Sequence, residues 1–512
     1  MRKLLRLGAV IALVLHVACG GGGSGGGTPP PPNVRPPNFV FILTDDQSLP
    51  TLAQMPLVKS LLTDQGTTFA SHYVSLSLCC PSRITGLRGQ YAHNTTIFGN
   101  GPPEGGFDAI YNLGLEQSTI ATWLQAAGYR TALIGKYVNG YPEAGPSPTY
   151  IPPGWTEFFS SNVGLPYRGF NYSLNENGRT VAYGEDEDDY LTDVLSAKAT
   201  DFISRSIDQD KPFFAYVAPY APHAPATPAP RHENLFNDVQ LPRTDSFNEA
   251  DVSDKPAWVR GLPLLNADQI DQMDKLYRNR LRSLQAVDEM VRDIIDTLQA
   301  KGQLENTYII YASDNGHHQG QHRMDTGKMT AYEEDIRVPL IVRGPGVPRG
   351  ASVSLMTANV DYAPTIAALA GVTAPAFVDG RSLVPFLQGQ TPATWRQVLL
   401  LEHKPDADDD LALMQRALTN GLLEPPDPFD LSLLGNGSEI TAFNGLRTAS
   451  GLTYVEYATN EFELYDNLAD PLQLASRYAT APADLKARLA SQVATLKTAT
   501  GNALRAAEET AP

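Results

Sequence analysis

The chain has 512 residues and carries 39 lysines and arginines against 56 aspartates and glutamates, a formal net charge of −17. Hydrophobic residues make up 42% and charged residues 19%, which is typical of globular proteins and excludes a wholly disordered chain. The acidic balance argues against nucleic acid as a partner, and three cysteines are too few for a disulfide scaffold.

Residues 1–19 have the features of a secretory signal. Basic residues precede an apolar run at 7–17, which is too short to span a bilayer. The small residue Ala18 stands directly before Cys19, and this arrangement resembles a bacterial lipoprotein signal. We therefore expect export to the periplasm or cell surface, with a lipid anchor on Cys19 as the only membrane contact. The alternative is ordinary cleavage near Ala18 without a lipid.

Residues 20–37 are rich in glycine, serine and proline and predict a linker that holds a folded body away from a surface. The main domain is expected at 38–390. Continuous apolar runs within it are typical of buried parallel strands. These runs lie at 38–47, 131–135, 212–219, 307–316 and 338–345.

Helical patterns alternate with these strands. One helix is predicted at 118–129 with Ser118 as its N-cap, and a longer one runs from about 267 to 301. Strands that alternate with helices predict an α/β sheet covered by helices on both faces. Ligands of such sheets bind outside the carboxyl ends of the strands.

Residues 391–512 predict a smaller C-terminal α+β subdomain. A strand at 398–403 is followed by an irregular stretch, and 445–471 is typical of a small antiparallel sheet of short strands. A closing helix is predicted at 482–499.

The two remaining cysteines are adjacent, in the sequence Cys79-Cys80-Pro81-Ser82-Arg83. Taken alone this could be a turn in the core. Together with Leu87 and Gly89, however, it resembles the signature of the sulfatase family. The resemblance implies that a maturation enzyme oxidises Cys79 to formylglycine (3-oxoalanine). It also implies a large mixed, mostly parallel sheet between helices, which makes 38–390 a sulfatase catalytic domain.

Carboxylate and amide side chains end two of the predicted strands, Asp45 and Asp46 in one case and Asp314 and Asn315 in the other. Such oxygen donors suit a hard divalent cation. The matching family positions bind a divalent cation, usually Ca²⁺, beside the modified Cys79. Each pair alone could instead serve a turn or a helix cap.

Basic residues follow other strand ends and match family motifs. The resemblance implies that Arg83, Lys136 and Lys328 neutralise sulfate oxygens, and that His223, alone or together with Lys328, protonates the leaving alcohol. His318 is a candidate for the second base, which takes a proton from the hydrated aldehyde. Val138 stands where many sulfatases carry a histidine.

We therefore expect a sulfuric ester hydrolase that removes O-sulfate from a carbohydrate or an aryl sulfate. The similarity is greatest to N-acetylglucosamine-6-sulfatases and related glycosaminoglycan sulfatases. One alternative is a phosphonate monoester hydrolase or phosphodiesterase of the same superfamily. Another is a surface lipoprotein that binds glycans without catalysis.

Overall fold

The computed structural model describes residues 35–143, 145–405 and 440–512. Cys19 and residues 20–34 lie outside these ranges, so the lipid anchor and most of the linker stay predictions. No helix of the described residues is long and apolar enough to cross a membrane.

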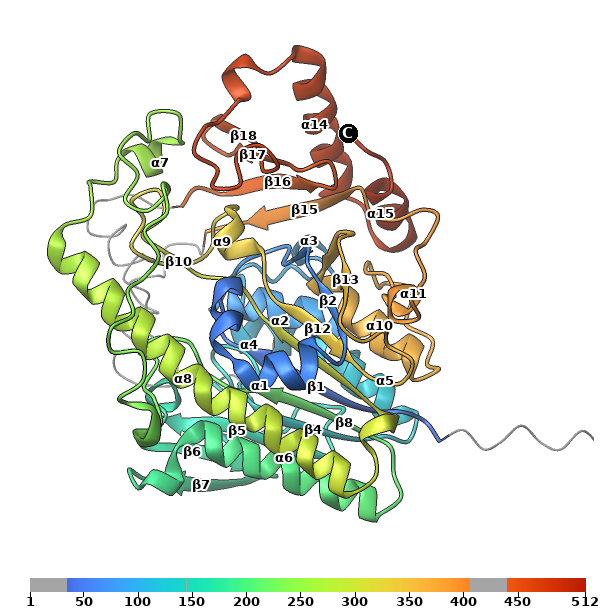
Figure 1. The fold of residues 1–512 in the computed structure, drawn as a ribbon. Coiled ribbons are helices and arrows are strands. Elements are labelled where there is room, and N and C mark those ends of the chain that lie inside the picture. Colours follow the sequence, from blue (N-terminus) through green and yellow to red (C-terminus); the bar gives the residue numbers. More distant parts are fainter. Residues whose placement is uncertain (1–34, 144, 406–439) are drawn as a thin grey trace, which may run out of the picture. The chain divides into compact units, whose positions relative to one another are not determined.

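A mixed ten-stranded sheet forms the core of the described residues (Figure 1). In sheet order its strands are β13 (Ala351–Val353), β2 (Thr67–Phe69), β12 (Leu340–Arg343), β9 (Thr307–Ser313), β1 (Asn38–Thr44), β8 (Phe213–Ala218), β4 (Arg130–Gly135), β5 (Glu157–Gly164), β6 (Tyr172–Glu176) and β7 (Arg179–Tyr183). The pairing from β9 through β5 is parallel, whereas β12, β6 and β7 run antiparallel to their neighbours. The predicted α/β class with a mixed, mostly parallel sheet is confirmed.

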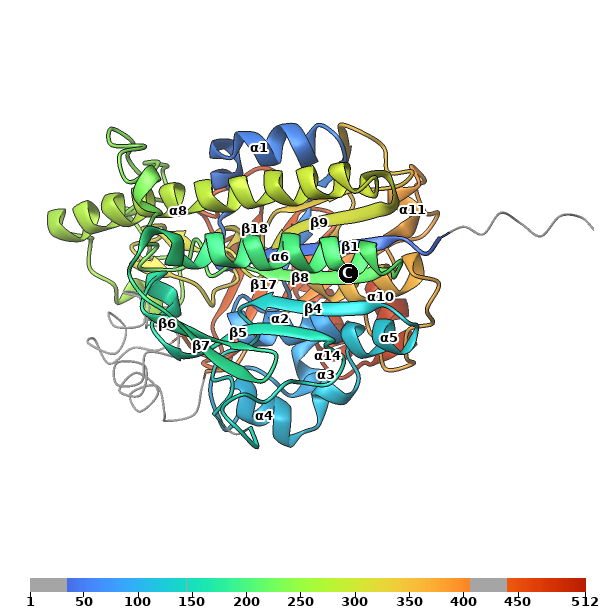
Figure 2. The ribbon, with the colours of Figure 1, turned by 90° about the horizontal axis from the view of Figure 1, so that it is seen from below.

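The central strand β1 is buried along its whole length because helices cover both faces of the sheet. Phe39, Phe41 and Leu43 contribute to one core layer, and Val40 and Ile42 contribute to the opposite layer. The first layer is covered by α2 (Cys79–Arg88), α5 (Ile120–Ala126) and α10 (Tyr362–Leu369), and the second by α1 (Pro56–Val58), α6 (Leu191–Asp208) and α8 (Ala267–Ala300). In Figure 2, helix α6 of the second layer lies in front of the strands.

Short elements connect this framework. They are β3 (His72–Tyr73), β14 (Thr357–Ala358), β10 (His318–Gln319), β11 (Thr326–Gly327), α3 (Ala92–Thr95), α4 (Gly106–Asn112), α7 (Ala257–Arg260), α9 (Glu333–Ile336) and α11 (Val384–Leu387). The hairpin of β10 and β11 leads directly into residue 328.

The two helices predicted within the main domain form, but one cap differs. Helix α8 begins after Asn266, whose side chain accepts a hydrogen bond from the backbone of Gln269. Helix α5 is capped by Thr119 rather than by Ser118. The hydroxyl of Ser118 instead accepts the indole N–H of Trp123 at 2.9 Å, so it is engaged by a side chain of the first turns.

The C-terminal residues form an antiparallel sheet of β15 (Val398–His403), β16 (Phe443–Thr448), β17 (Leu452–Tyr457) and β18 (Phe462–Asp466). Helix α14 (Ala483–Leu496) corresponds to the predicted closing helix, and a further helix, α15 (Gly501–Glu508), follows it. The boundary at residue 390 stays a prediction.

A buried network of ion pairs connects α15 to residues 361, 381 and 396. Glu508 accepts hydrogen bonds from Arg396 at 2.9 Å and Arg381 at 2.8 Å, and Arg396 also forms two bonds to Asp361. The side chains of Glu508, Arg396 and Asp361 are inaccessible to solvent. Removal of one member of such a network leaves charges buried without compensation, which is strongly destabilising.

We therefore expect Glu508→Ala to lower the free energy of unfolding by about 3–5 kcal/mol, measured by urea denaturation. The adjacent Glu509 is exposed and pairs with Arg381 at the surface, so Glu509→Ala is the matched control and should cost less than about 1 kcal/mol. Equal losses in the two variants would contradict this assignment of the network.

A second contact joins His93 to residues of the C-terminal part of the chain. His93 contacts the Glu402 carboxylate at 2.9 Å and the Ala499 carbonyl at 3.0 Å. Burial lowers the pKa of His93, but the hydrogen bond and charge of Glu402 outweigh burial, so the pKa is raised overall.

A raised pKa stabilises the fold fully below the unfolded value of about 6.5, and this contribution is lost as the pH rises through the folded pKa. We expect the melting temperature of His93→Gln to fall furthest below that of the native chain at pH 5.5, with a smaller difference at pH 8.5. A constant difference across this range would show that the charge of His93 adds nothing.

Candidate active site

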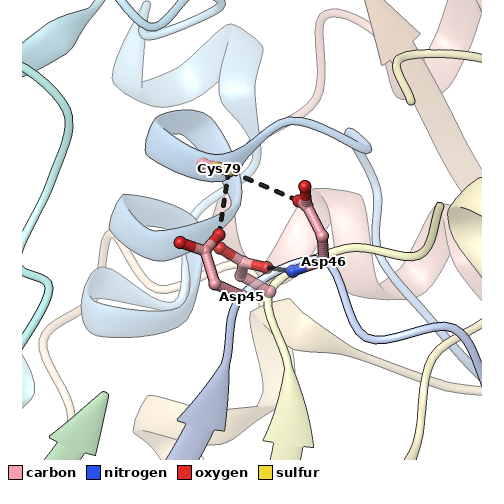
Figure 3. Close-up of side chains that lie close together, drawn as sticks. Asp45, Asp46 and Cys79 are labelled. Carbon is pink, nitrogen blue, oxygen red and sulfur yellow. Dashed lines mark hydrogen bonds between the residues drawn. The ribbon is translucent and has the colours of Figure 1, made fainter. Parts of the chain in front are cut away.

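Cys79 is the first residue of α2 and lies opposite the two carboxylates that follow β1. Its Sγ is 3.3 Å from Asp45 Oδ1 and 3.7 Å from Asp46 Oδ1, and Figure 3 shows both carboxylates directed toward it. All three residues are completely buried. Because Cys79 begins α2, the positive end of the helix dipole lies at this residue, where it favours negative charge.

The second pair of predicted metal ligands reaches the same place because β1 and β9 are paired in parallel. Thr44 is in register with Ser313, so the residues that follow each strand emerge side by side. Ligand atoms of Asp45, Asp46, Cys79 and Asp314 all lie within 4.8 Å of one another. The structure thus brings together these members of the predicted metal set.

The donor set fits a hard cation. Asn315 donates its amide N–H to Asp46 Oδ1 at 2.6 Å, while its own Oδ1 is buried and lacks a hydrogen-bond partner among the described residues. A buried acceptor without a donor is costly unless something else binds it. Carboxylate oxygens and this amide oxygen are the ligand types of Ca²⁺ and Mg²⁺.

The carboxylates differ in their electrostatics. Burial raises the pKa of Asp314 to about 6, although the Arg83 guanidinium opposes this effect. Burial would also raise the pKa of Asp45, but the charges of Lys136 and Arg83 outweigh it and hold that pKa below its usual value. The site therefore concentrates acidic groups that positive charge must stabilise.

Arg83 lies one turn along α2 from Cys79 and connects two strand ends. Its guanidinium contacts Asp314 Oδ2 at 2.8 Å and donates to the Lys136 carbonyl at 3.1 Å. Lys136, which follows β4, contacts Asp45 Oδ2 at 2.8 Å through its ammonium group. Both cations are buried, so their charges act in a medium that screens them weakly.

Lys328 and His223 complete the cluster. The Lys328 ammonium lies 2.9 Å from Asp46 Oδ1, 3.1 Å from Cys79 Sγ and 3.5 Å from His223 Nε2. His223 follows β8, and its Nδ1 lies 2.8 Å from the Ala224 carbonyl. That carbonyl can only accept, so Nδ1 carries a proton and Nε2 is the nitrogen directed toward the site.

His318 lies in β10 and is held by Asp335, whose carboxylate oxygens are 2.9 and 3.0 Å from Nδ1. A carboxylate on one ring nitrogen orients a histidine and stabilises its cation, as a general base requires. Its role as the second base stays a prediction. Val138 is buried in the hydrophobic core under the sheet.

The C-terminal sheet reaches this part of the site through α9. Tyr332, at the start of α9, donates its hydroxyl to Glu463 of β18 at 2.9 Å. Arg447 of β16 donates to Glu333 at 2.6 Å. Because Asp335 lies in the same helix, the position of His318 depends on the C-terminal sheet.

Three features of the site were not predicted from sequence. Arg280 of α8 is fully buried and donates to the backbone carbonyls of Asp46 and Pro222. Asp46 adopts a left-handed backbone with φ of 63°, which aspartate tolerates better than most residues. The ring of Tyr167 packs against His223 and Lys136. No local sequence pattern marks any of them.

The chain is similar to known proteins. A family model described as Sulfatase matches residues 37–372. An N-acetylglucosamine-6-sulfatase from Homo sapiens is 34% identical over 486 residues, which are 92% of this chain and 86% of that protein. An arylsulfatase from Volvox carteri is 38% identical over 367 residues, 65% of this chain and 56% of the relative. The chain therefore spans little more than half the length of the Volvox protein.

A solved structure shares the fold. It is a complex of a protein with its substrate D-glucosamine-2-N,6-O-disulfate, and it superposes with a TM-score of 0.70 at 24% sequence identity. The superposition covers 90% of this chain and 97% of the other.

The donor set predicts that a divalent cation stabilises the fold. After treatment with a chelator, added Ca²⁺ should raise the free energy of unfolding by about 2.7 kcal/mol at a hundredfold excess over its dissociation constant, measured by thermal denaturation. Asp46→Ala should abolish this increase, and Asp251→Ala, which alters an exposed acid, should retain it. Absence of a response to Ca²⁺, Mg²⁺ and Mn²⁺ would refute the metal site.

Proposed function

Because the chain belongs to the sulfatase family of sulfuric ester hydrolases, we propose that it cleaves an O-sulfate ester through a formylglycine made from Cys79. The observation that carries this proposal is the environment of Cys79. Its sulfur lies among two carboxylates and the Lys328 ammonium, at the positive end of a helix.

One hydroxyl of a hydrated formylglycine at residue 79 would attack sulfur, and the S–O bond to the alcohol would break. The other hydroxyl would then lose its proton, so that the carbonyl re-forms and the C–O bond to sulfate breaks. Lys328 lies 3.1 Å from Cys79 Sγ and is therefore close enough to orient and polarise a group at this position. Burial excludes bulk water, which strengthens each of these contacts.

Charge on the sulfate oxygens requires preorganised cations, and the site supplies three. Each of them is held by a carboxylate: Arg83 by Asp314, Lys136 by Asp45 and Lys328 by Asp46. A cation bound by Asp45, Asp46, Asp314 and Asn315 would add positive charge at the same place. Such groups stabilise the transition state without reorganising during the reaction.

His223 is positioned to protonate the leaving alcohol. Its Nδ1 contact with the Ala224 carbonyl leaves Nε2 directed toward the reaction centre, as a general acid requires once this nitrogen is protonated. Histidine suits this task because its unperturbed pKa lies near neutral pH.

The proposed substrate class is a sulfated amino sugar. Support comes from the names of the human relative, an N-acetylglucosamine-6-sulfatase, and of the structural neighbour bound to D-glucosamine-2-N,6-O-disulfate. The signal-like residues 1–19 further support export, and the lipid anchor at Cys19 belongs to the same proposal.

The two adjacent cysteines allow a matched test. We expect Cys79→Ala to reduce turnover of 4-nitrophenyl sulfate to background, because the aldehyde cannot form. Cys80→Ala, which alters a core residue of the same helix, should retain most of the turnover. Mass spectrometry of the native chain should find the aldehyde at residue 79.

Three outcomes would contradict the proposal. They are an unmodified thiol at residue 79 in protein from its native host, undiminished turnover in Cys79→Ala, or hydrolysis of a matched nitrophenyl phosphodiester or phosphonate far faster than that of the sulfate.

A further inference from the structure

Tyr167 is an aromatic residue at the edge of the basic cluster. It lies in a short 3₁₀ helix, Pro166–Arg168, that connects β5 to β6, and its exposed fraction is 8%. Tyr167 is the one residue of this connection that the site described above includes. Its ring nevertheless contacts two of the proposed catalytic groups, which come from different strands.

The first contact is with His223. The ring centroids of Tyr167 and His223 are 4.7 Å apart, with an angle of 58° between the ring planes. The imidazole is thus held by the Ala224 carbonyl at Nδ1 and by an aromatic ring against its side. Two restraints of this kind limit rotation about the histidine side-chain bonds and fix the direction of Nε2.

The second contact is with Lys136. Its Nζ lies 5.3 Å from the centroid of the Tyr167 ring, within the range of a cation–π interaction, and 2.8 Å from Asp45 Oδ2. The rings of Tyr220 and Tyr167 pack edge to face, with centroids 5.0 Å apart and an angle of 89° between their planes, which gives Tyr167 a further aromatic contact. The ammonium of Lys136 therefore contacts both a carboxylate and an aromatic ring.

We propose that Tyr167 is a positioning residue, which holds the His223 imidazole and the Lys136 ammonium in one fixed relative arrangement. The inference rests on the roles proposed for those two residues. Both contacts that carry the inference are made by the ring.

Loss of the ring should affect proton donation more than binding. A misplacement of about 1 Å in a catalytic group can cost about a hundredfold in rate. Proton transfer matters most for a poor leaving group, because an acidic phenol departs without assistance. A leaving-group series therefore reports on His223 separately from general damage to the fold.

The test uses phenyl sulfates whose phenols differ in acidity, from 4-nitrophenyl sulfate to unsubstituted phenyl sulfate. In Tyr167→Leu we expect kcat to fall on every substrate, with a loss about tenfold larger for phenyl sulfate than for 4-nitrophenyl sulfate, and KM to change by less than kcat. Tyr167→Phe keeps the ring and should retain the native dependence on the leaving group. Tyr167→Met provides a second ring deletion if the leucine variant does not fold.

Tyr183→Leu is the matched control, since it removes a ring that stacks on Tyr172 within the same sheet edge, outside the site. It should leave the leaving-group dependence unchanged even where stability falls. An unchanged dependence in both ring deletions, or the same change in Tyr167→Phe, would overturn the inference.

The variant His223→Ala distinguishes a failure of the inference about Tyr167 from a failure of the role proposed for His223. If it steepens the leaving-group dependence while Tyr167→Leu does not, only the inference about Tyr167 fails. If His223→Ala has no effect on the dependence, the role proposed for His223 fails and the inference falls with it.

Discussion

Three carboxylates lie buried within a few ångströms of one another at the ends of β1 and β9. Like charges in a medium of low polarity repel strongly, and each buried ion loses its hydration. Neighbouring groups must therefore supply positive charge at close range. Arg83, Lys136 and Lys328 do so from a helix, a strand end and a hairpin. The convergence of these separate segments follows from the need to neutralise one acidic cluster.

The members of this cluster differ in how far their positions could be predicted from sequence. Two polar pairs each ended an apolar run, and parallel strands bring their carboxyl ends to one edge, so the meeting of Asp45 with Asp314 was predictable. Arg280 and Tyr167 could not be found in this way. Each acts through contacts with residues distant in sequence, and neither stands in a local pattern that differs from an ordinary helix or loop.

The fold shows a similar division. The long buried strands and the amphipathic helix α8 carry strong sequence signals, and both formed. The run at 338–345 was predicted as a parallel strand, and this was wrong in orientation, because β12 pairs antiparallel with both β9 and β2. The cap of α5 shifted by one residue because two adjacent hydroxyl side chains compete for that position. Helix α15 escaped prediction because buried charge pairs hold it, with Glu508 contacting residues more than 100 positions away in the sequence.

The burial of Cys79 bears on whether its oxidation precedes or follows folding. In the folded structure residues 79–88 form a helix in which every residue is buried, so another enzyme cannot bind this segment or reach the thiol of Cys79. An oxidation of Cys79 by a separate catalyst must then happen while the segment is still extended. Oxidation of Cys79 would then have to precede folding, and a chain that folded first would keep an unmodified thiol and lack the aldehyde.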